Sequence, residues 1–175
     1  ALCLRSNAPH HKTQFMAALS IDKAAGDIVI QCIILTGGIA SRMRPITEKI
    51  PKALINVGRH SFIHYQLERL RICGITDVVL CIGYKGEMIR DFVGNGHRWG
   101  LNVEYVDEGT NLRGTAGAIR LACDCGAAYE NFLVMYGDSL LPVNFAEVFQ
   151  AFLASKQPAL MTVYRNMCLW DTSNV

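Results

Sequence analysis

The sequence lacks a strong net charge, and it lacks any long uninterrupted apolar segment. Its 17 lysines and arginines nearly balance 15 aspartates and glutamates, which gives a formal charge of +2. A charge so mild and dispersed argues against a nucleic-acid groove or an anionic membrane surface as partner. No apolar stretch is long enough to span a bilayer, and the first residues do not form the apolar region of a signal peptide. These absences predict a cytoplasmic protein in which any anion is bound locally.

Several common site motifs are missing as well. The seven cysteines form no C-x-x-C pair and no histidine spacing typical of zinc, so neither a disulfide framework nor a zinc finger is expected. The phosphate-binding motifs G-x-x-x-x-G-K-[ST] and G-x-G-x-x-G are also absent, which disfavours P-loop NTPases and NAD-dependent enzymes. What is present is a chain of 175 residues that is 51% hydrophobic, enough for the core of one domain.

Apolar segments of two kinds alternate along the chain. Segments rich in β-branched residues predict strands over 28–35, 76–84, 101–106, 131–138 and 158–166. Apolar residues at helical spacing predict helices over 61–74 and 86–94, a third just after Gly114 and a fourth capped by Asn144. Such alternation indicates an α/β fold with a doubly wound, mainly parallel sheet.

Residues 1–27 show no sustained periodicity. They are expected to form a tail or a short helix outside the core. The folded domain is therefore expected over residues 28–175.

Glycine-rich or acidic segments follow three of the predicted strands. They are Gly37-Gly38, the segment "EGTNLRGTAGA" from Glu108, and "GDS" around Asp138. In open α/β sheets ligands bind beyond the carboxyl ends of the strands, so these segments are candidates for one site. Glycines let backbone N–H groups approach an anion, although a glycine pair by itself more often forms a plain turn.

Basic and acidic side chains strengthen the case for a phosphate site. Arg42 and Lys52 follow the glycine pair, and guanidinium and ammonium groups neutralise phosphate oxygens. Pro45 and Pro51 stiffen the same loop, although a solvated basic loop remains the alternative. Asp138 stands at the tip of an apolar strand, where it could hold Mg²⁺ or cap a turn. The basic loop and Asp138 together favour a metal and phosphate site.

These segments resemble the nucleoside-diphosphate-sugar pyrophosphorylases, also called sugar nucleotidyltransferases. The family signature L-x-G-G-x-G-[ST]-R-[LM]-x-P-[LIT]-T, followed by P-K-x-L, stands here as "LTGGIASRMRPITEKIPKAL". The similarity continues through "GITDVVLCIGYKGEMIRDFVGNGHRWGLNVEYVDE", "GTAGAI" and "YGDSLL", and it covers roughly residues 29–175. "ALMTVYRN" followed by "WDTSNV" is similar to the bacterial branch that acts on heptose or hexose 1-phosphates, some of whose members are guanylyltransferases.

The resemblance implies a Rossmann-like fold of the nucleotide-diphospho-sugar transferase type. It implies transfer of a nucleotidyl group from GTP, UTP or dTTP to a sugar 1-phosphate, with Mg²⁺ as cofactor and pyrophosphate as product. Arg42 and Lys52 would be catalytic, and Asp138 would hold the metal. The nucleotide-binding residues that it implies are Leu35, Gly37, Gly38, Ser41, Glu108, Gly114 and Thr115, with Glu108 at the edge of the base. A homo-oligomer is a further expectation.

The sequence departs from the family pattern at three places. Ala40 stands at the usual third glycine, and alanine disfavours positive φ. Arg113 stands where leucine is common, beside the base pocket. The chain stops at Val175, before the segment that carries the family's second metal-binding aspartate. Two alternatives to an enzyme therefore remain: a non-catalytic nucleotide or sugar-phosphate binding module, and an inactive fragment incomplete at its C-terminus.

Overall fold

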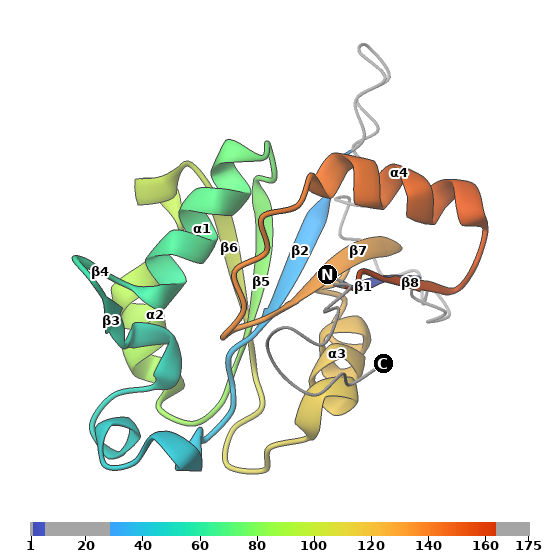
Figure 1. Cartoon of the computed structure of the whole chain (residues 1–175). Coiled ribbons are helices and arrows are strands. Elements are labelled where there is room, and N and C mark those ends of the chain that lie inside the picture. Colours follow the sequence, from blue (N-terminus) through green and yellow to red (C-terminus); the bar gives the residue numbers. More distant parts are fainter. Residues whose placement is uncertain (1, 6–28, 164–175) are drawn as a thin grey trace, which may run out of the picture.

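The computed structural model describes residues 2–5 and 29–163, which form a six-stranded sheet with helices on both faces (Figure 1). The strands are β1 (Leu2–Arg5), β2 (Gln31–Leu35), β5 (Asp77–Ile82), β6 (Asn102–Asp107), β7 (Asn131–Tyr136) and β8 (Ala159–Met161). Their order across the sheet is β6-β5-β2-β7-β1-β8. A separate ribbon pairs β3 (Asn56–Val57) with β4 (His60–Ser61). The mainly parallel α/β sheet expected from the sequence is confirmed.

Four α-helices occupy the predicted helical segments. They are α1 (Phe62–Ile72), α2 (Gly86–Val93), α3 (Gly114–Asp124) and α4 (Phe145–Ser155). The Asn144 side chain accepts hydrogen bonds from the backbone N–H groups of Ala146 and Glu147, so the predicted cap of α4 is confirmed. Four 3-10 turns complete the described elements: η1 (Ser41–Met43), η2 (Ile46–Glu48), η3 (Lys52–Leu54) and η4 (His97–Trp99).

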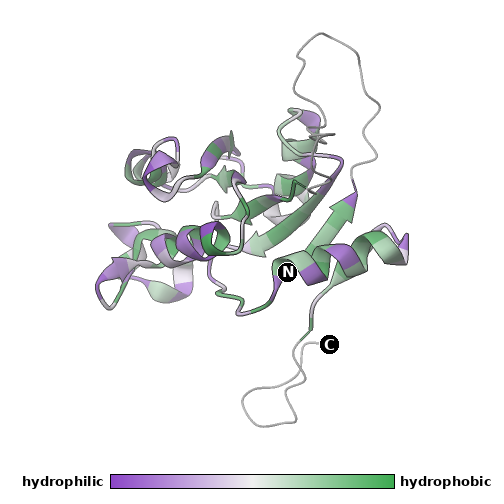
Figure 2. Cartoon of the chain, turned by 90° about the horizontal axis from the view of Figure 1, so that it is seen from above, coloured by the Kyte–Doolittle hydropathy of each residue, from purple (hydrophilic) through white to green (hydrophobic). Residues whose placement is uncertain are grey.

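Alternating side chains of the strands build a core on each face of the sheet. Cys32 and Ile34 of β2 pack in the cluster that α1, α2 and α4 cover, whereas Ile33 packs in the cluster under α3. Figure 2 shows the strands largely in the hydrophobic colour, with mixed polar and apolar residues on the helices around them. Helices on both faces make the sheet doubly wound. Within residues 2–5 and 29–163, no helix combines the length and apolar character that crossing a bilayer requires.

The parallel strands bring distant loops to one edge of the sheet. β2 pairs in parallel with β5 and with β7, and β5 pairs in parallel with β6. Their carboxyl ends therefore point the same way. In Figure 1 the loop after β2 (cyan) and the loop between β6 and α3 (yellow) both lie at the lower end of the sheet. This edge is where the sequence places its candidate residues.

The expectation that residues 1–27 lie outside the core is wrong for Leu2–Arg5. β1 pairs antiparallel with β7 on one side and with β8 on the other, and its Cys3 is fully buried. The Arg5 guanidinium lies 5.4 Å from the centre of the Phe152 ring of α4. Four residues are too few to show the period-2 alternation that identifies a strand. Residues 6–28, the end of the fifth predicted strand and "WDTSNV" lie outside the described residues.

Candidate functional site

The two glycines after β2 have different surroundings. A Cβ on Gly37 would lie 2.6 Å from Glu108 Oε1 and 3.4 Å from the backbone nitrogen of Gly83, whereas one on Gly38 would meet nothing within 4 Å. The Gly37 carbonyl also accepts a hydrogen bond from the Tyr84 N–H at 3.2 Å. Gly37 therefore serves the close packing of the strand ends. Gly38 is exposed, and its backbone is open to a ligand.

Beyond the glycines, the loop is fixed by one buried threonine. Thr47 Oγ1 donates to the Ala40 carbonyl at 3.1 Å, and the Tyr84 hydroxyl donates to the Thr47 carbonyl, also at 3.1 Å. Ala40 has φ 50° and ψ 46°, the left-handed conformation that alanine disfavours. Between these anchors η1 holds Ser41 and Arg42 on the surface. Thr47 is the last residue of the signature "LTGGIASRMRPIT", but sequence reasoning assigned it no role.

Lys52 and Asp138, which are 86 residues apart in the sequence, form a direct ion pair. Lys52 Nζ donates to Asp138 Oδ2 at 2.7 Å, and the Ser139 hydroxyl donates to Asp138 Oδ1 at 3.4 Å. The hydrogen bond from Lys52 lowers the pKa of the Asp138 carboxyl, although partial burial acts in the opposite direction. The Lys52 and Asp138 side chains are 38% and 48% exposed, so solvent screens their attraction. The Lys52 ammonium and the Asp138 carboxylate are thus in contact at a place that solvent can reach.

Helix α1 holds the turn that carries Asp138. Gln66 is fully buried, and its Nε2 donates to the carbonyls of Tyr136 at 2.9 Å and Ser139 at 2.8 Å. One helical turn later, Arg69 Nη2 donates to the Val143 carbonyl at 3.0 Å. Sequence reasoning missed Gln66. The available signal was a polar residue on the apolar face of a predicted helix.

Glu108 is held beside Gly37 by the start of α3. Its Oε2 accepts a hydrogen bond from the Arg113 N–H at 2.7 Å, and its own N–H donates to the Ile82 carbonyl at 2.9 Å. Arg113 itself is exposed. Gly114 follows with φ 69°, a backbone conformation that suits glycine and that begins α3. The Glu108 carboxylate therefore has one oxygen fixed by the backbone and the other against Gly37.

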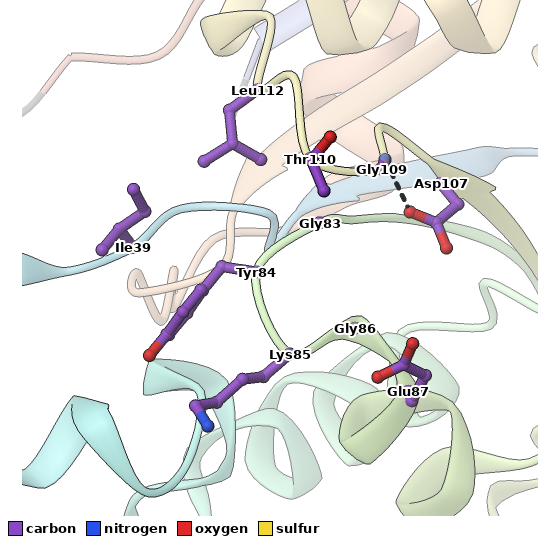
Figure 3. A pocket seen from close by; sticks show the side chains of 10 residues that line it. All are labelled: Ile39, Gly83, Tyr84, Lys85, Gly86, Glu87, Asp107, Gly109, Thr110 and Leu112. Carbon is purple, nitrogen blue, oxygen red and sulfur yellow. Dashed lines mark hydrogen bonds between the residues drawn. The ribbon is translucent and has the colours of Figure 1, made fainter.

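A hollow of about 540 Å³ opens between the loops that follow β2, β5 and β6. Figure 3 shows Ile39, Leu112 and Tyr84 around it, with Lys85 and Glu87 from the start of α2. The remaining lining residues are Gly83, Gly86, Asp107, Gly109 and Thr110. Sequence reasoning assigned no role to Gly83 and Tyr84 and did not select the others. All of these residues lie at or just beyond the carboxyl ends of strands, which is the signal that could have identified them.

The donor groups around Asp138 suit one kind of metal. Within the described part of the chain, no three His, Cys, Asp or Glu side chains group as a metal centre. Structural and catalytic zinc need three or four such ligands. Mg²⁺, in contrast, is bound by one or two carboxylates and completes its shell with waters and substrate phosphates. Asp138, with the Ser139 hydroxyl beside it, fits a Mg²⁺ ion that arrives with a phosphate.

The structure thus brings some of the candidate residues together and leaves others separate. Lys52 contacts Asp138, Glu108 contacts Gly37 and the residue before Gly114, and the Leu35 carbonyl accepts a hydrogen bond from the Gly137 N–H at 2.9 Å. The remaining candidates are exposed and, among residues 2–5 and 29–163, make no hydrogen bond or ion pair with another candidate: Gly38, Ser41, Arg42 and Thr115.

Relatives of this chain share its sequence pattern. It is 33% identical over 145 residues to an N-acetylmuramate alpha-1-phosphate uridylyltransferase of Neisseria meningitidis, covering 83% of this chain and 60% of that protein. It is 34% identical over 127 residues to a D-glycero-alpha-D-manno-heptose 1-phosphate guanylyltransferase of Aneurinibacillus thermoaerophilus, covering 73% of this chain and 54% of that protein. The chain therefore spans little more than half the length of these relatives.

A solved structure shares the fold. HddC from Yersinia pseudotuberculosis, complexed with GMP-PN, superposes with a TM-score of 0.62 at 26% identity, over 71% of this chain and 55% of that one. The profile of the family described as Nucleotidyl transferase matches residues 31–167, which include the whole glycine-rich and basic loop, Glu108 and Asp138. The chain belongs to the nucleotidyl transferase family.

Proposed function

We propose that this chain transfers a nucleotidyl group from an NTP to a sugar 1-phosphate and releases pyrophosphate, in a reaction that depends on Mg²⁺. The observation that carries the proposal is the contact of Lys52 Nζ with Asp138 Oδ2 at 2.7 Å. This contact supports the proposal because it joins an ammonium group, which suits phosphate oxygens, to a carboxylate, which suits Mg²⁺, beyond the carboxyl ends of β2 and β7. The two relatives described above are named for transfer to a sugar 1-phosphate.

In the proposed reaction, an oxygen of the sugar 1-phosphate attacks the α-phosphorus of the NTP, and the bond to the pyrophosphate oxygen breaks. The attacking phosphate is already ionised near neutral pH, so no general base is required. Arg42 binds the triphosphate and the departing pyrophosphate, and Lys52 binds the sugar phosphate and the α-phosphate. Mg²⁺ held by Asp138 neutralises phosphate charge when it is bound. Positioning and charge neutralisation supply most of the catalysis in reactions of this type.

The ion pair that Lys52 forms in this structure is compatible with these roles. An exposed pair of this kind is worth only about 0–1 kcal/mol, because water solvates both partners and screens their attraction. Two polyanionic substrates and a divalent cation therefore separate the pair at little cost. Lys52 then meets phosphate oxygens, and the Asp138 carboxylate meets the metal.

The base of the nucleotide is proposed to lie at the hollow beside Glu108. Ile39 and Leu112 supply apolar surface there, as ligand pockets usually do. An ionised carboxylate only accepts hydrogen bonds, so Glu108 selects bases that carry a ring N–H group on the pairing edge. These are guanine, uracil and thymine, which makes GTP, UTP and dTTP the candidates. The presence of GMP-PN in the HddC complex makes GTP the first nucleotide to test.

The proposed compartment is the cytoplasm. Cys3, Cys32 and Cys81 are buried thiols. Burial raises the pKa of the Cys3 thiol to about 11 and that of Cys81 to about 12, so both stay protonated and unreactive. Buried thiols of this kind suit a reducing environment.

Pyrophosphate release tests the proposed reaction directly. The chain is incubated with MgCl₂ and GTP, UTP or dTTP, together with mannose, glucose, heptose or N-acetylmuramate 1-phosphate. We expect release that requires both the nucleotide and one of the sugar phosphates, and that stops when EDTA removes the metal. If no combination releases pyrophosphate, the catalytic proposal fails for this chain.

A second candidate function is a nucleotide-binding module without catalysis. It is favoured by the described residues, among which no three His, Cys, Asp or Glu side chains group as a metal centre. Mg-GTP would then raise the unfolding temperature, because a ligand that binds the folded state stabilises it, but no pyrophosphate would form. An inactive fragment would show neither the stabilisation nor the product.

A further inference from the structure

We propose that Gln66 is a positioning residue of this site. It fixes the turn from Tyr136 to Ser139 so that the Asp138 carboxylate faces Lys52, and it thereby sets the affinity for Mg²⁺ bound together with a nucleotide. The part of the inference that concerns the turn stands on geometry alone. The part that concerns the metal rests on the proposed function.

The Gln66 side chain forms hydrogen bonds with both ends of the turn. Its Nε2 donates to the Tyr136 carbonyl at 2.9 Å and to the Ser139 carbonyl at 2.8 Å, which are the residues two before and one after Asp138. Both acceptors are carbonyl oxygens, so only the NH₂ end of the amide can face them, and the orientation of the side chain is fixed. Gln66 uses both of its donors on this one turn.

Filling the core does not explain this glutamine. Its neighbours on the buried face of α1 are the fully buried Ile63, Leu67 and Leu70, and Gln66 is equally buried. Among the described residues, its Oε1 has no hydrogen-bond partner. A buried acceptor without a partner is costly, so an apolar side chain would suit this helix better if packing were the only requirement. The two bonds to the turn are what the glutamine provides.

Helix α1 also connects Gln66 to the opposite half of the ion pair. η3, which carries Lys52, packs against α1, and the Ile55 carbonyl accepts a hydrogen bond from the N–H of Phe62, the first residue of α1. The same rigid helix therefore supports the Lys52 loop through its first turn and the Asp138 turn through Gln66. The spacing between the ammonium and the carboxylate depends on this one element.

Gln31 offers a matched control at the other end of the sheet. It is also buried, at 3% exposure, and it also ties backbone groups: Nε2 donates to the Ala127 carbonyl at 2.9 Å, and Oε1 accepts from the Tyr129 N–H at 2.7 Å. Gln31→Met and Gln66→Met therefore remove the same chemical group from equally buried positions. Only the second lies at the Asp138 turn.

Amide hydrogen exchange tests the geometric part. In Gln66→Met the amides of Gly137, Asp138 and Ser139 should exchange about tenfold faster, as the loss of typical hydrogen bonds implies. In Gln66→Glu they should exchange faster still, because carboxylate oxygens would face carbonyl oxygens. Gln31→Met should leave these amides unchanged. Equal protection of the turn in wild type and Gln66→Met would overturn the proposal.

The wild-type protein supplies a check that does not depend on any variant folding. Both side-chain NH₂ protons of Gln66 should be protected from exchange with solvent in NMR spectra, because both are engaged in buried hydrogen bonds. Rapid exchange of these two protons would also overturn the proposal.

Calorimetry with GTP, with and without MgCl₂, tests the metal part. The ratio of the two dissociation constants measures how strongly the metal and the nucleotide support each other. Gln66→Met should reduce this ratio by about 10–100-fold, the usual effect of removing a group that orients a metal ligand, with little change in the affinity for GTP alone. Gln31→Met should keep the wild-type ratio.

The two tests separate the possible failures. If wild type binds no GTP, the proposed function fails while the exchange experiment still decides the role of Gln66. If MgCl₂ strengthens GTP binding to the same extent in wild type and in Gln66→Met, Gln66 does not position the metal ligand.

Discussion

The two ends of strands β2 and β7 use a buried glutamine in different ways. At the amino end, Gln31 satisfies both halves of its amide, on the Ala127 carbonyl and the Tyr129 N–H. At the carboxyl end, Gln66 uses only its NH₂ group, and its oxygen has no partner among residues 2–5 and 29–163. The amino end is arranged for stability. At the carboxyl end, Gln66 leaves its amide oxygen without a partner among the described residues, while its NH₂ group fixes a turn.

The charged candidate residues at the carboxyl end are accessible to solvent. Lys52 and Asp138 at the carboxyl end are 38% and 48% exposed, and Arg42 is exposed in the adjoining loop. Groups left accessible in this way contribute little to the folded state. They remain available to bind a ligand. The comparison predicts that substitutions of exposed residues at the carboxyl edge alter binding and catalysis more than stability. Substitutions where the backbone beneath the site is closely packed should lower stability instead.

The largest expected effect is the loss of a phosphate-binding cation. Lys52→Ala and Arg42→Ala should each lower turnover by about 10²–10³-fold, because each removes a group that stabilises charge in the transition state. Pyrophosphate release measures the effect. Lys49→Ala removes an exposed lysine from the same loop and should keep the wild-type rate. Wild-type rates for both Lys52→Ala and Arg42→Ala would contradict the assignment.

A glycine beneath the site should affect stability instead. A Cβ on Gly137 would lie 2.6 Å from the Leu35 carbonyl oxygen and 2.8 Å from Thr36 Cγ2, so Gly137→Ala should lower the free energy of unfolding by about 1–3 kcal/mol. Gly38→Ala, with open space around its Cβ, should leave that free energy unchanged and weaken GTP binding. Urea unfolding and calorimetry measure the two quantities. The idea fails if the two alanines have equal effects on unfolding.

Ala40 allows a change in the opposite direction. Its φ of 50° costs an L-residue about 1–2 kcal/mol of stability, and glycine avoids this cost. Glycine in turn loses about 0.5–1 kcal/mol of stability, because it has more conformational freedom in the unfolded chain. Ala40→Gly should therefore stabilise the protein by up to about 1.5 kcal/mol in urea unfolding. Ala116→Gly, on the exposed side of α3, should destabilise it by about 0.5–1 kcal/mol. The same sign for both changes would rule out strain at Ala40.

The smallest effect concerns acid stability. Because the Lys52 hydrogen bond lowers the pKa of the Asp138 carboxyl, the pair stabilises the fold above the ordinary aspartate pKa of about 3.9, and this contribution disappears as the pH falls through the lowered pKa. Exposure limits it to less than about 1 kcal/mol. Asp138→Asn should thus be slightly less stable than wild type in urea at pH 7 and equal to it in strong acid. A constant difference at both pH values would exclude the ion pair as the cause.

Periodicity was sufficient to predict the parallel part of the fold. β2, β5, β6 and β7 lie in the segments expected as strands, because buried parallel strands are short, nearly continuous apolar segments. β1 could not be predicted, since the four residues Leu2–Arg5 depend on pairing with β7 and β8 far along the chain. Local sequence carries no signal for such pairing.

The sequence predicted which edge of the sheet carries the candidate residues, but not the contacts between them. Lys52, Glu108 and Asp138 were placed together because parallel strands end on the same side. The direct ion pair, the Thr47 bonds and the role of Gln66 depend on side-chain positions that periodicity does not specify. Gln66 in particular occupies a helical position that the pattern assigns to the core.

A crystal structure of this chain with GTP and Mn²⁺, which scatters anomalously and replaces Mg²⁺, tests the central claim most directly. The account predicts an anomalous peak in contact with the Asp138 carboxylate, with the phosphates between that metal and Arg42 and the base beside Glu108. Lys52 should have left Asp138 for a phosphate oxygen. A nucleotide bound away from the carboxyl edge of β2 and β7, or a metal peak without Asp138, would contradict it.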